Sequence, residues 1–298
     1  MQMTDASSFY PDTAVEVARL INLDRLLTTA MGGILPGLLE TNLPNLHTVL
    51  DLGCGPGSWV LDIAFDHPEC EVAGVDVRQK MIEYAWARAR TQQCFNASFG
   101  VMDMTQPLDF SDNTFDLIHA HVPVGVFHGD DWVSLISECM RILCPGGLLY
   151  LIDTDRVIET NSPAFARLTT LLRQAKRLAG YCVSSDEGML DSSLILPQLL
   201  HRAGFQHVRC TTHFVDVSDE AASWADFFHN TEMIYSQVQP LLLAAELVTR
   251  KEINQLYTQM LIELYMQSFT GRWPVLCIYG TKPVSGEQRP APDTKHDT

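Results

Sequence analysis

The chain has 298 residues, 46% of them hydrophobic and 9% aromatic, and its acidic residues outnumber the basic ones by 36 to 20, giving a formal net charge of −16. This composition predicts a globular protein, and the length fits two domains or one α/β domain with insertions. Since binding to a nucleic-acid backbone needs clustered Lys and Arg, which are lacking here, we expect no nucleic-acid partner.

The N-terminal residues lack the basic start and apolar core of a signal peptide, and no apolar run reaches the roughly 20 residues that span a bilayer. We therefore expect no membrane partner and a cytoplasmic location. The eight cysteines are scattered and form no Cys-x-x-Cys pair. Such cysteines usually behave as small buried apolar residues, so neither disulfides nor a zinc site is expected.

Residues 1–45 read as helical and end in a loop, and we interpret them as an N-terminal helical cap segment. From residue 46 onward, short apolar runs alternate with helical patterns, which is typical of a parallel, doubly wound α/β sheet. The expected strands cover residues 47–53, 71–77, 97–103, 114–122, 145–153, 207–217 and 273–282.

The spacing of apolar residues predicts helices over 58–66, 78–90, from about 130, over 157–180 and over 194–205. For the helix from about residue 130 we expect an inner stripe of Val133, Ile136, Met140 and Leu143. Residues 46–283 then form one core with helical insertions at about 157–190 and 219–269. The polar tail at 284–298 has almost nothing to bury and is expected to be disordered.

The sequence VLDLGCGPGSW, residues 49–59, places three glycines directly after the first strand. Ligands of doubly wound sheets bind at the carboxyl ends of the strands, and Gly53 and Gly55 can take positive φ and let a ligand approach the backbone. An ordinary strand-to-helix turn is the alternative interpretation. A dinucleotide site would need a third glycine where this chain has Ser58, and Asp51 suits a cationic ligand better than a pyrophosphate.

This stretch resembles the first motif of the class I S-adenosylmethionine-dependent methyltransferases, which place the loop under the methionine part of their cofactor. The segments GVDV, VMDM, FDLIHAHV and RILCPGGLLYLID follow in the family's order, so the resemblance covers about residues 46–155. It implies a Rossmann-like, seven-stranded, mostly parallel sheet with helical cap insertions. It also implies S-adenosyl-L-methionine as cofactor.

The resemblance also implies a role for several residues. Asp76, at the end of the second strand, would accept hydrogen bonds from the ribose hydroxyls. Asp103 would accept from the adenine amino group, and Met104 would donate its backbone N–H to the ring. The expected cofactor-binding residues are Asp51, Gly53, Cys54, Gly55, Gly57, Asp76, Val77, Asp103, Met104 and His119.

His119, His121 and His128 straddle the end of the fourth strand, where the family presents its acceptor. These rings either pack around the cofactor, or one of them acts as a general base, His121 first and His119 second. An unperturbed pKa near 6.5 would let His121 take a proton at neutral pH. Although His119 and His121 share a strand face, no acid at a suitable spacing completes a metal site, and we predict none.

Asp153 and Asp155 end the fifth strand, where catechol-type relatives bind a metal, but an aspartate beside Arg156 is more simply interpreted as half of an ion pair. Aromatic residues of the second insertion, among them Phe227 and Tyr235, either line an apolar pocket under a helical lid or belong to the core.

The sequence thus predicts a methyltransferase for a small, largely apolar molecule, of the kind used in secondary metabolism, with O-, N- or C-methylation left open. Two alternatives remain at this point. The first is a protein that keeps the fold and S-adenosylmethionine but uses them for other chemistry or as a binding module. The second, less favoured, is an NAD(P)-dependent oxidoreductase. A homodimer is also left open.

Overall fold

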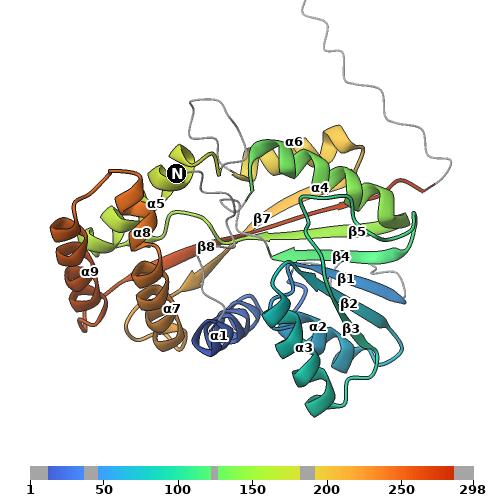
Figure 1. Ribbon diagram of the computed structural model, residues 1–298, viewed down its shortest axis with the longest axis horizontal. Helices are drawn as coiled ribbons and strands as arrows, with labels where there is room; N and C mark the ends of the chain where they lie inside the picture. The colour runs from blue at the N-terminus through green and yellow to red at the C-terminus, as the bar shows by residue number, and fades with distance from the viewer. Residues whose placement is uncertain (1–12, 37–45, 122–126, 182–191, 285–298) are drawn as a thin grey trace, which may run out of the picture.

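The computed structural model describes residues 13–36, 46–121, 127–181 and 192–284, and within them the strands form one sheet. Helices cover both faces of this sheet (Figure 1). The strands are β1 (Thr48–Leu52), β2 (Glu71–Asp76), β3 (Ala97–Val101), β4 (Phe115–His121), β5 (Leu143–Asp153), β6 (Glu159–Thr160), β7 (Gln206–Asp216) and β8 (Gly271–Thr281).

The sheet has the strand order β3-β2-β1-β4-β5-β8-β6, and β7 also pairs with β8. The strands β1 to β5 are parallel, whereas β8 is antiparallel to β5, β6 and β7. This arrangement confirms the predicted α/β, mostly parallel sheet. The prediction of seven strands missed β6, whose two residues are too few to give an alternating pattern.

The helices are α1 (Ala14–Ala30), α2 (Ser58–Asp66), α3 (Gln79–Gln92), α4 (Gly129–Ile142), α5 (Pro163–Leu178), α6 (Ser192–Ala203), α7 (Trp224–Gln237), α8 (Gln239–Ala244) and α9 (Arg250–Leu264). Figure 1 shows α4 and α6 on one face of the sheet and α2 and α3 on the other. One apolar core fills each face, as expected for a doubly wound fold.

The buried stripe of α4 differs from the predicted one. Trp132, Leu135 and Ile136 are buried, whereas Val133 is 52% exposed. Both stripes have helical spacing, and the one that contains the larger apolar side chain, Trp132, faces the sheet. Burying an indole rather than an isopropyl group removes more apolar surface from water, which decides the rotation of the helix.

The helices of the two insertions pack together beside the sheet. Figure 1 shows α5, α7, α8 and α9 grouped on one side, with α1 between this group and α2. The contacts agree, because α1 packs against both α7 and α2, and α5 packs against α8 and α9. Helix α1, which precedes the first strand, therefore meets α7, which lies between β7 and the last strand, β8.

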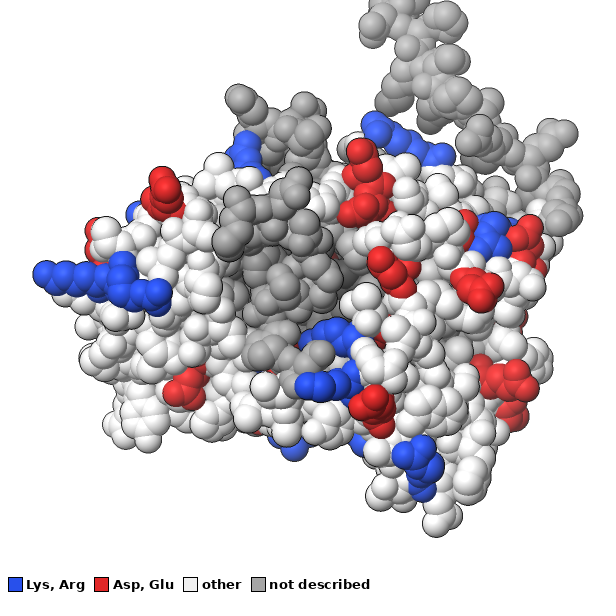
Figure 2. Space-filling model, viewed as in Figure 1, with Lys and Arg blue, Asp and Glu red and all other residues white. Residues whose placement is uncertain are grey.

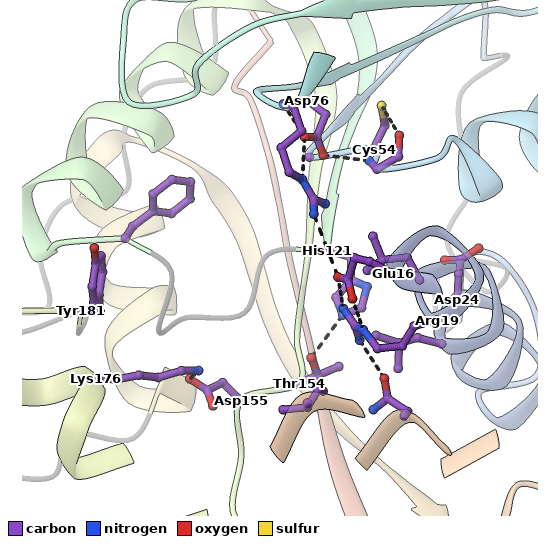
Figure 3. A pocket seen from close by; sticks show the side chains of 18 of the residues that line it. Glu16, Arg19, Asp24, Cys54, Asp76, His121, Thr154, Asp155, Lys176 and Tyr181 are labelled. Atoms are coloured by element: carbon purple, nitrogen blue, oxygen red, sulfur yellow. Dashed lines mark hydrogen bonds and ion pairs between the residues drawn. The ribbon is translucent and has the colours of Figure 1, made fainter. Parts of the chain in front are cut away.

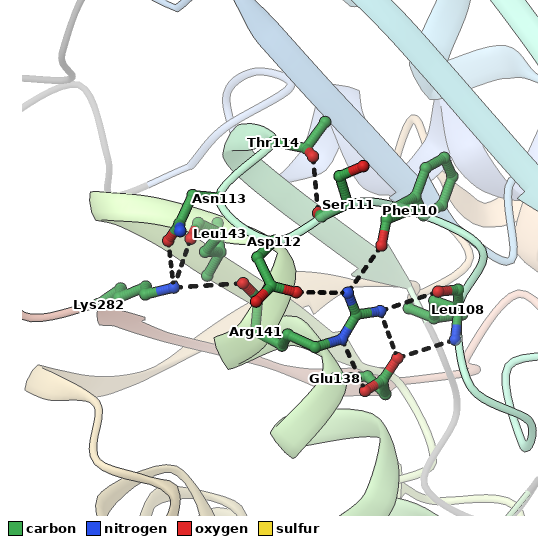
Figure 4. Close-up of polar contacts among 10 residues, drawn as sticks. All are labelled: Leu108, Phe110, Ser111, Asp112, Asn113, Thr114, Glu138, Arg141, Leu143 and Lys282. Carbon is green, nitrogen blue, oxygen red and sulfur yellow. Dashed lines mark hydrogen bonds and ion pairs between the residues drawn. The ribbon is translucent and has the colours of Figure 1, made fainter.

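A network around Arg141 fixes the connection between β3 and β4 to α4 (Figure 4). The Arg141 guanidinium donates to the Glu138 carboxylate at 2.7 Å, to Asp112 at 2.9 Å and to the carbonyls of Leu108 and Phe110. Hydrogen bonding from Arg141 holds the pKa of Glu138 below its usual range. The connection is thus anchored on the face of the sheet that carries α4.

No helix in the described ranges is both long and apolar enough to cross a membrane. The seven described cysteines all carry free thiols. Most of the predicted disordered tail, residues 285–298, lies outside the described residues, as do residues 1–12 and 37–45 of the predicted N-terminal segment.

Candidate functional site

A cavity of about 650 Å³ lies at the carboxyl ends of β1, β2 and β4, and α1, α5 and α7 contribute to its lining. Ligands of doubly wound sheets bind at this edge. The structure brings nearly all the sequence-predicted residues to this one cavity. Its lining includes Asp51, Gly53, Cys54, Gly55, Asp76, Val77, Asp103, Met104, His119 and His121.

The glycine loop divides into a part that faces the cavity and a part that does not. Gly53 and Gly55 have φ of 77° and 51° and line the cavity. Gly57, with φ of 76°, begins α2 and is absent from the lining. A Cβ on Gly57 would lie 2.7 Å from the Phe99 ring. The third glycine is therefore required for helix packing, because no side chain fits there.

Asp76 is held in place by the backbone on both sides. One carboxylate oxygen accepts from the N–H of Gly55 at 3.0 Å, and the other accepts from the N–H of Arg78 at 2.9 Å. Two carboxylate oxygens offer about four acceptor positions in total, and the oxygen bonded to Gly55 keeps capacity for a further donor. The other oxygen also accepts from the Arg78 Nε at 3.4 Å. Asp76 can therefore accept from two adjacent hydroxyls of a ligand when one of them replaces this long side-chain contact, and both backbone bonds are kept.

Asp103 and Met104 lie on the connection after β3, and both line the cavity. One Asp103 carboxylate oxygen accepts from the Thr105 N–H at 2.9 Å and from its hydroxyl at 2.8 Å. The other oxygen makes no such bond to Thr105. Asp103 is exposed, so this oxygen can be hydrated when no ligand is present. It is available to accept a hydrogen bond from a ligand amino group.

Asp51 and His119 form a buried pair at the base of the cavity. The His119 Nδ1 lies 2.7 Å from an Asp51 carboxylate oxygen, and the Trp59 ring stacks on the imidazole with centroids 4.0 Å apart. Among the residues that the structure describes, none hydrogen-bonds to His119 Nε2. Burial raises the pKa of Asp51, while the neighbouring His119 opposes that rise. Trp59 and Asp51 thus fix the His119 ring against β1.

His121 lies further along β4 and reaches a different partner, because its Nε2 is 3.2 Å from the Thr154 hydroxyl. Burial, followed by the charges of His119 and Arg19, lowers the pKa of His121 to about 3. The expectation of an unperturbed pKa near 6.5 is therefore wrong. The imidazole is neutral at physiological pH, where it can hydrogen-bond but is a weak proton acceptor.

The remaining predicted polar residues have separate partners. His128 Nδ1 lies 3.0 Å from the Gly180 carbonyl oxygen, and its ring stacks on Tyr181. Asp155 pairs with Lys176 at 2.9 Å, and the buried Asp153 accepts from Ser192. The interpretation of an aspartate here as half of an ion pair fits Asp155, for which Lys176 is a partner.

Helix α1 supplies cavity residues that sequence reasoning did not single out. Glu16 and Arg19 are buried and joined by two hydrogen bonds of 2.7 Å, and Arg19 also donates to Asn230 of α7 at 2.7 Å. Figure 3 shows Glu16, Arg19 and Asp24 projecting from this helix into the site. A charged pair three residues apart was the available signal, but such pairs are common on exposed helix faces.

Asp24 is a second carboxyl of the site, besides Asp51, whose pKa is raised. Burial, then the charges of Asp51 and Asp62, raise its pKa to about 7, although Arg88 opposes the shift. Asp24 and Asp51 both line the cavity. Carboxylates that repel each other in a shared space are stabilised by a cation placed near them, so this wall favours a positively charged ligand.

The opposite end of the cavity is largely apolar. It lies between α5, α7 and β8, and Figure 3 shows Lys176, Asp155 and Tyr181 there, away from Asp76 and Cys54. His121 and Thr154 lie between the two ends in this view. The apolar side chains that line this region are Phe165, Leu172, Phe227, Ile234, Tyr235 and Trp273.

A family model described as a methyltransferase domain matches residues 49–147, which contain the glycine loop, Asp76, Asp103 and His119. This match confirms the resemblance to the class I S-adenosylmethionine-dependent methyltransferases over this part of the chain. The chain is 30% identical over 109 residues to a demethylmenaquinone methyltransferase of Lactococcus lactis, a match that covers 36% of this chain and 42% of that protein. It is 34% identical over 118 residues to phosphoethanolamine N-methyltransferase 3 of Arabidopsis thaliana, covering 40% and 23% of the two chains.

Solved structures, one of them of a methyltransferase, share the fold over most of this chain. Phosphoethanolamine N-methyltransferase 2 of Haemonchus contortus, in complex with phosphomonomethylethanolamine and S-adenosylhomocysteine, has a TM-score of 0.52 at 16% identity and covers 93% of this chain and 58% of its own. The YcgJ protein of Bacillus subtilis has a TM-score of 0.50 at 18% identity, with coverage of 88% and 98%. The chain matches less than half the length of the first curated methyltransferases, 42% and 48%.

Proposed function

We propose that the protein transfers a methyl group from S-adenosyl-L-methionine to a small molecule. The observation that carries this proposal is the single cavity that joins the glycine loop and Asp76 to an apolar chamber lined by α5 and α7. One end has the bare backbone and carboxylates that suit a cationic nucleoside. The other end has room and apolar surface for a second molecule.

The residues of the first end fit this cofactor. Asp76 can accept from two ribose hydroxyls, and Gly55 leaves the backbone open, since a Cβ there would have Leu20 at 3.6 Å as its nearest neighbour. Asp24 and Asp51 would favour a sulfonium and an ammonium. Asp103 and Met104 would hold the base. When bound, the cofactor supplies an electrophilic methyl group.

The residues of the second end would align the acceptor and keep water away. Methyl transfer is an in-line displacement, so positioning contributes much of the rate. Phe165, Leu172 and Tyr235 offer apolar contacts, and α1, α5 and α7 cover this space. We propose that these helices, with the rest of the insertions, act as a cap over the acceptor.

Calorimetry tests the cofactor assignment. We expect S-adenosylmethionine and S-adenosylhomocysteine to bind, and Asp76→Ala to weaken both by about 1.5–3 kcal/mol, the range for hydrogen bonds to a charged group. Asp66→Ala is the matched control, because Asp66 is exposed and lies outside the cavity lining. Unchanged affinity in a folded Asp76→Ala variant would rule out the ribose role.

Transfer itself is measured with methyl-labelled S-adenosylmethionine and a panel of hydroxyl, amine and carbon acceptors. We expect formation of S-adenosylhomocysteine that depends on the acceptor and appears together with a labelled product. Tight cofactor binding without transfer to any acceptor would contradict the proposed activity and leave a binding or non-transferring protein.

A further inference from the structure

The two ends of the cavity differ in their charged side chains. Carboxylates outnumber cations on the wall next to the glycine loop, whereas cations outnumber carboxylates among the charged side chains of the otherwise apolar far end. Of the chain's 20 Lys and Arg residues, Arg156, Arg173 and Lys176 line the far end. Figure 2 shows Lys and Arg side chains on this face both near its centre and at its edges.

Two of these three cations, Lys176 and Arg156, have polar partners. Lys176 pairs with Asp155 at 2.9 Å, and Arg156 lies 3.5 Å from the Ser192 hydroxyl. Asp131, the other acid near this end, accepts from the backbone N–H of His128 and so caps α4. Neither acid is shown to pair with Arg173.

Arg173 differs from both. It is half-buried, and within the described part of the chain it makes no hydrogen bond or ion pair. It also lies on the cavity side of α5, because Phe165, Thr169, Leu172 and Lys176 line the cavity with it at helical spacing. A guanidinium placed in a partly buried apolar chamber costs free energy unless an anion pairs with it.

We propose that the acceptor is an amphipathic anion whose carboxylate or phosphate group binds Arg173. A planar guanidinium forms two parallel hydrogen bonds to either anion, and such charge-assisted pairs are stronger than neutral ones. The apolar body of the molecule contacts Phe165, Leu172 and Tyr235. The group to be methylated then points toward His121 and the cofactor end. This inference rests on the proposed function, which assigns the other end to the cofactor.

The test compares octanoate and octyl phosphate with octanol, which shares their apolar chain but lacks the charge. Calorimetry is done with S-adenosylhomocysteine present, on the wild type, Arg173→Gln, Arg173→Lys and the control Arg167→Gln. Arg167 is on the same helix but is exposed and outside the cavity. The anion that binds more tightly identifies a carboxylate or a phosphate as the preferred group.

We expect at least one anion to bind the wild type about tenfold or more tightly than octanol, and Arg173→Gln to remove that preference. Arg173→Lys should keep part of it, since the charge remains but the planar fork is lost. Arg167→Gln should leave it unchanged. Equal binding of anions and octanol by the wild type, or equal loss of both in Arg173→Gln, would overturn the inference.

Affinity for S-adenosylhomocysteine, measured alone on each variant, separates this inference from the proposed function. Normal affinity in Arg173→Gln shows that the cavity is folded and that only the anion site has changed. If S-adenosylhomocysteine fails to bind the wild type while the preference for anions persists without it, the proposed function fails and the anion site stands. Normal cofactor binding without any preference for anions rejects the anion site alone.

Discussion

Because the pKa of Asp24 is raised, the affinity of the proposed cofactor end for a cationic ligand should depend on pH. The Asp24 carboxyl titrates at about 7, so it is mostly protonated at about pH 6 and mostly ionised at about pH 8. A cation bound beside it favours the ionised form, and its binding releases a proton at low pH. Affinity for a cationic ligand therefore increases as the pH rises through the pKa.

S-adenosylmethionine and S-adenosylhomocysteine differ in the sulfonium charge and share the same amino group, so the ratio of their affinities isolates the charge effect. We expect this ratio to rise by up to about tenfold between about pH 6 and about pH 8, because a single titrating group allows no more. Asp24→Asn should flatten the curve. Calorimetry at several pH values measures it, and an equally steep curve in the variant would contradict the role of Asp24.

His121 should contribute by hydrogen bonding rather than by taking a proton, because its lowered pKa of about 3 makes it a poor base at neutral pH. We expect His121→Ala to change the Michaelis constant for the acceptor. The shape of the pH profile of kcat should stay as in the wild type. The wild type should show no limb near pH 6.5 that disappears in the variant. A limb that does disappear would return His121 to the role of general base.

At the scale of elements, α1 is attached to α7 through Arg19, which forms a buried ion pair with Glu16 within α1 and donates to Asn230 of α7. Glu16 and Arg19 have 1% and 6% of their side-chain surface exposed. Arg19→Met leaves the buried Glu16 carboxylate with a 4.0 Å contact to Arg78 in place of its 2.7 Å pair, so it should lower the free energy of unfolding by about 3–5 kcal/mol. Urea titration measures this change.

Arg25 provides the matched control for that measurement. It joins the same two helices through Asp226 at 2.9 Å, but 64% of its side chain is exposed. Exposed pairs contribute little, so Arg25→Met should cost less than about 1 kcal/mol. Similar losses in both variants would show that burial of the Glu16–Arg19 pair does not determine how firmly α1 is attached.

The elements on the sheet were predictable because their signals are local. Helix α2 occupies 58–66, as its apolar spacing indicates, and the strand ends carry the glycine loop and Asp76. The rotation of α4 was not predictable, since two stripes fit the same period and only packing chose Trp132 over Val133. The contribution of α1 was not predictable either, because Arg19 and Asn230 are 211 residues apart.

At the scale of the whole molecule, the proposed cap predicts a pattern of hydrogen exchange. When S-adenosylhomocysteine and an acceptor bind together, amides of α1, α5 and α7 should exchange more slowly, because lids become ordered over their ligands. Helix α6 contributes no residue to the cavity lining and serves as an internal control. Equal protection of all four helices with and without ligands would argue against a cap.

The position of β8 has a consequence for how the protein is made. This strand is the last in the sequence, yet it lies between β5 and β6 and also pairs with β7. During synthesis, β1 to β5 can pair as they emerge, but β7 must wait for the last segment, with the edge of β5 open meanwhile. Unpaired edges of this kind are prone to pair with other chains.

The same strand completes the chamber, since Trp273 of β8 lines the cavity and donates its indole N–H to the Thr154 carbonyl at 3.1 Å. The proposed acceptor end is therefore complete only after synthesis has passed residue 273, whereas the glycine loop is complete more than 200 residues earlier. A nascent chain that already has the cofactor loop but not the chamber cannot position an acceptor. Chain order thus delays assembly of the full site until the sheet has closed.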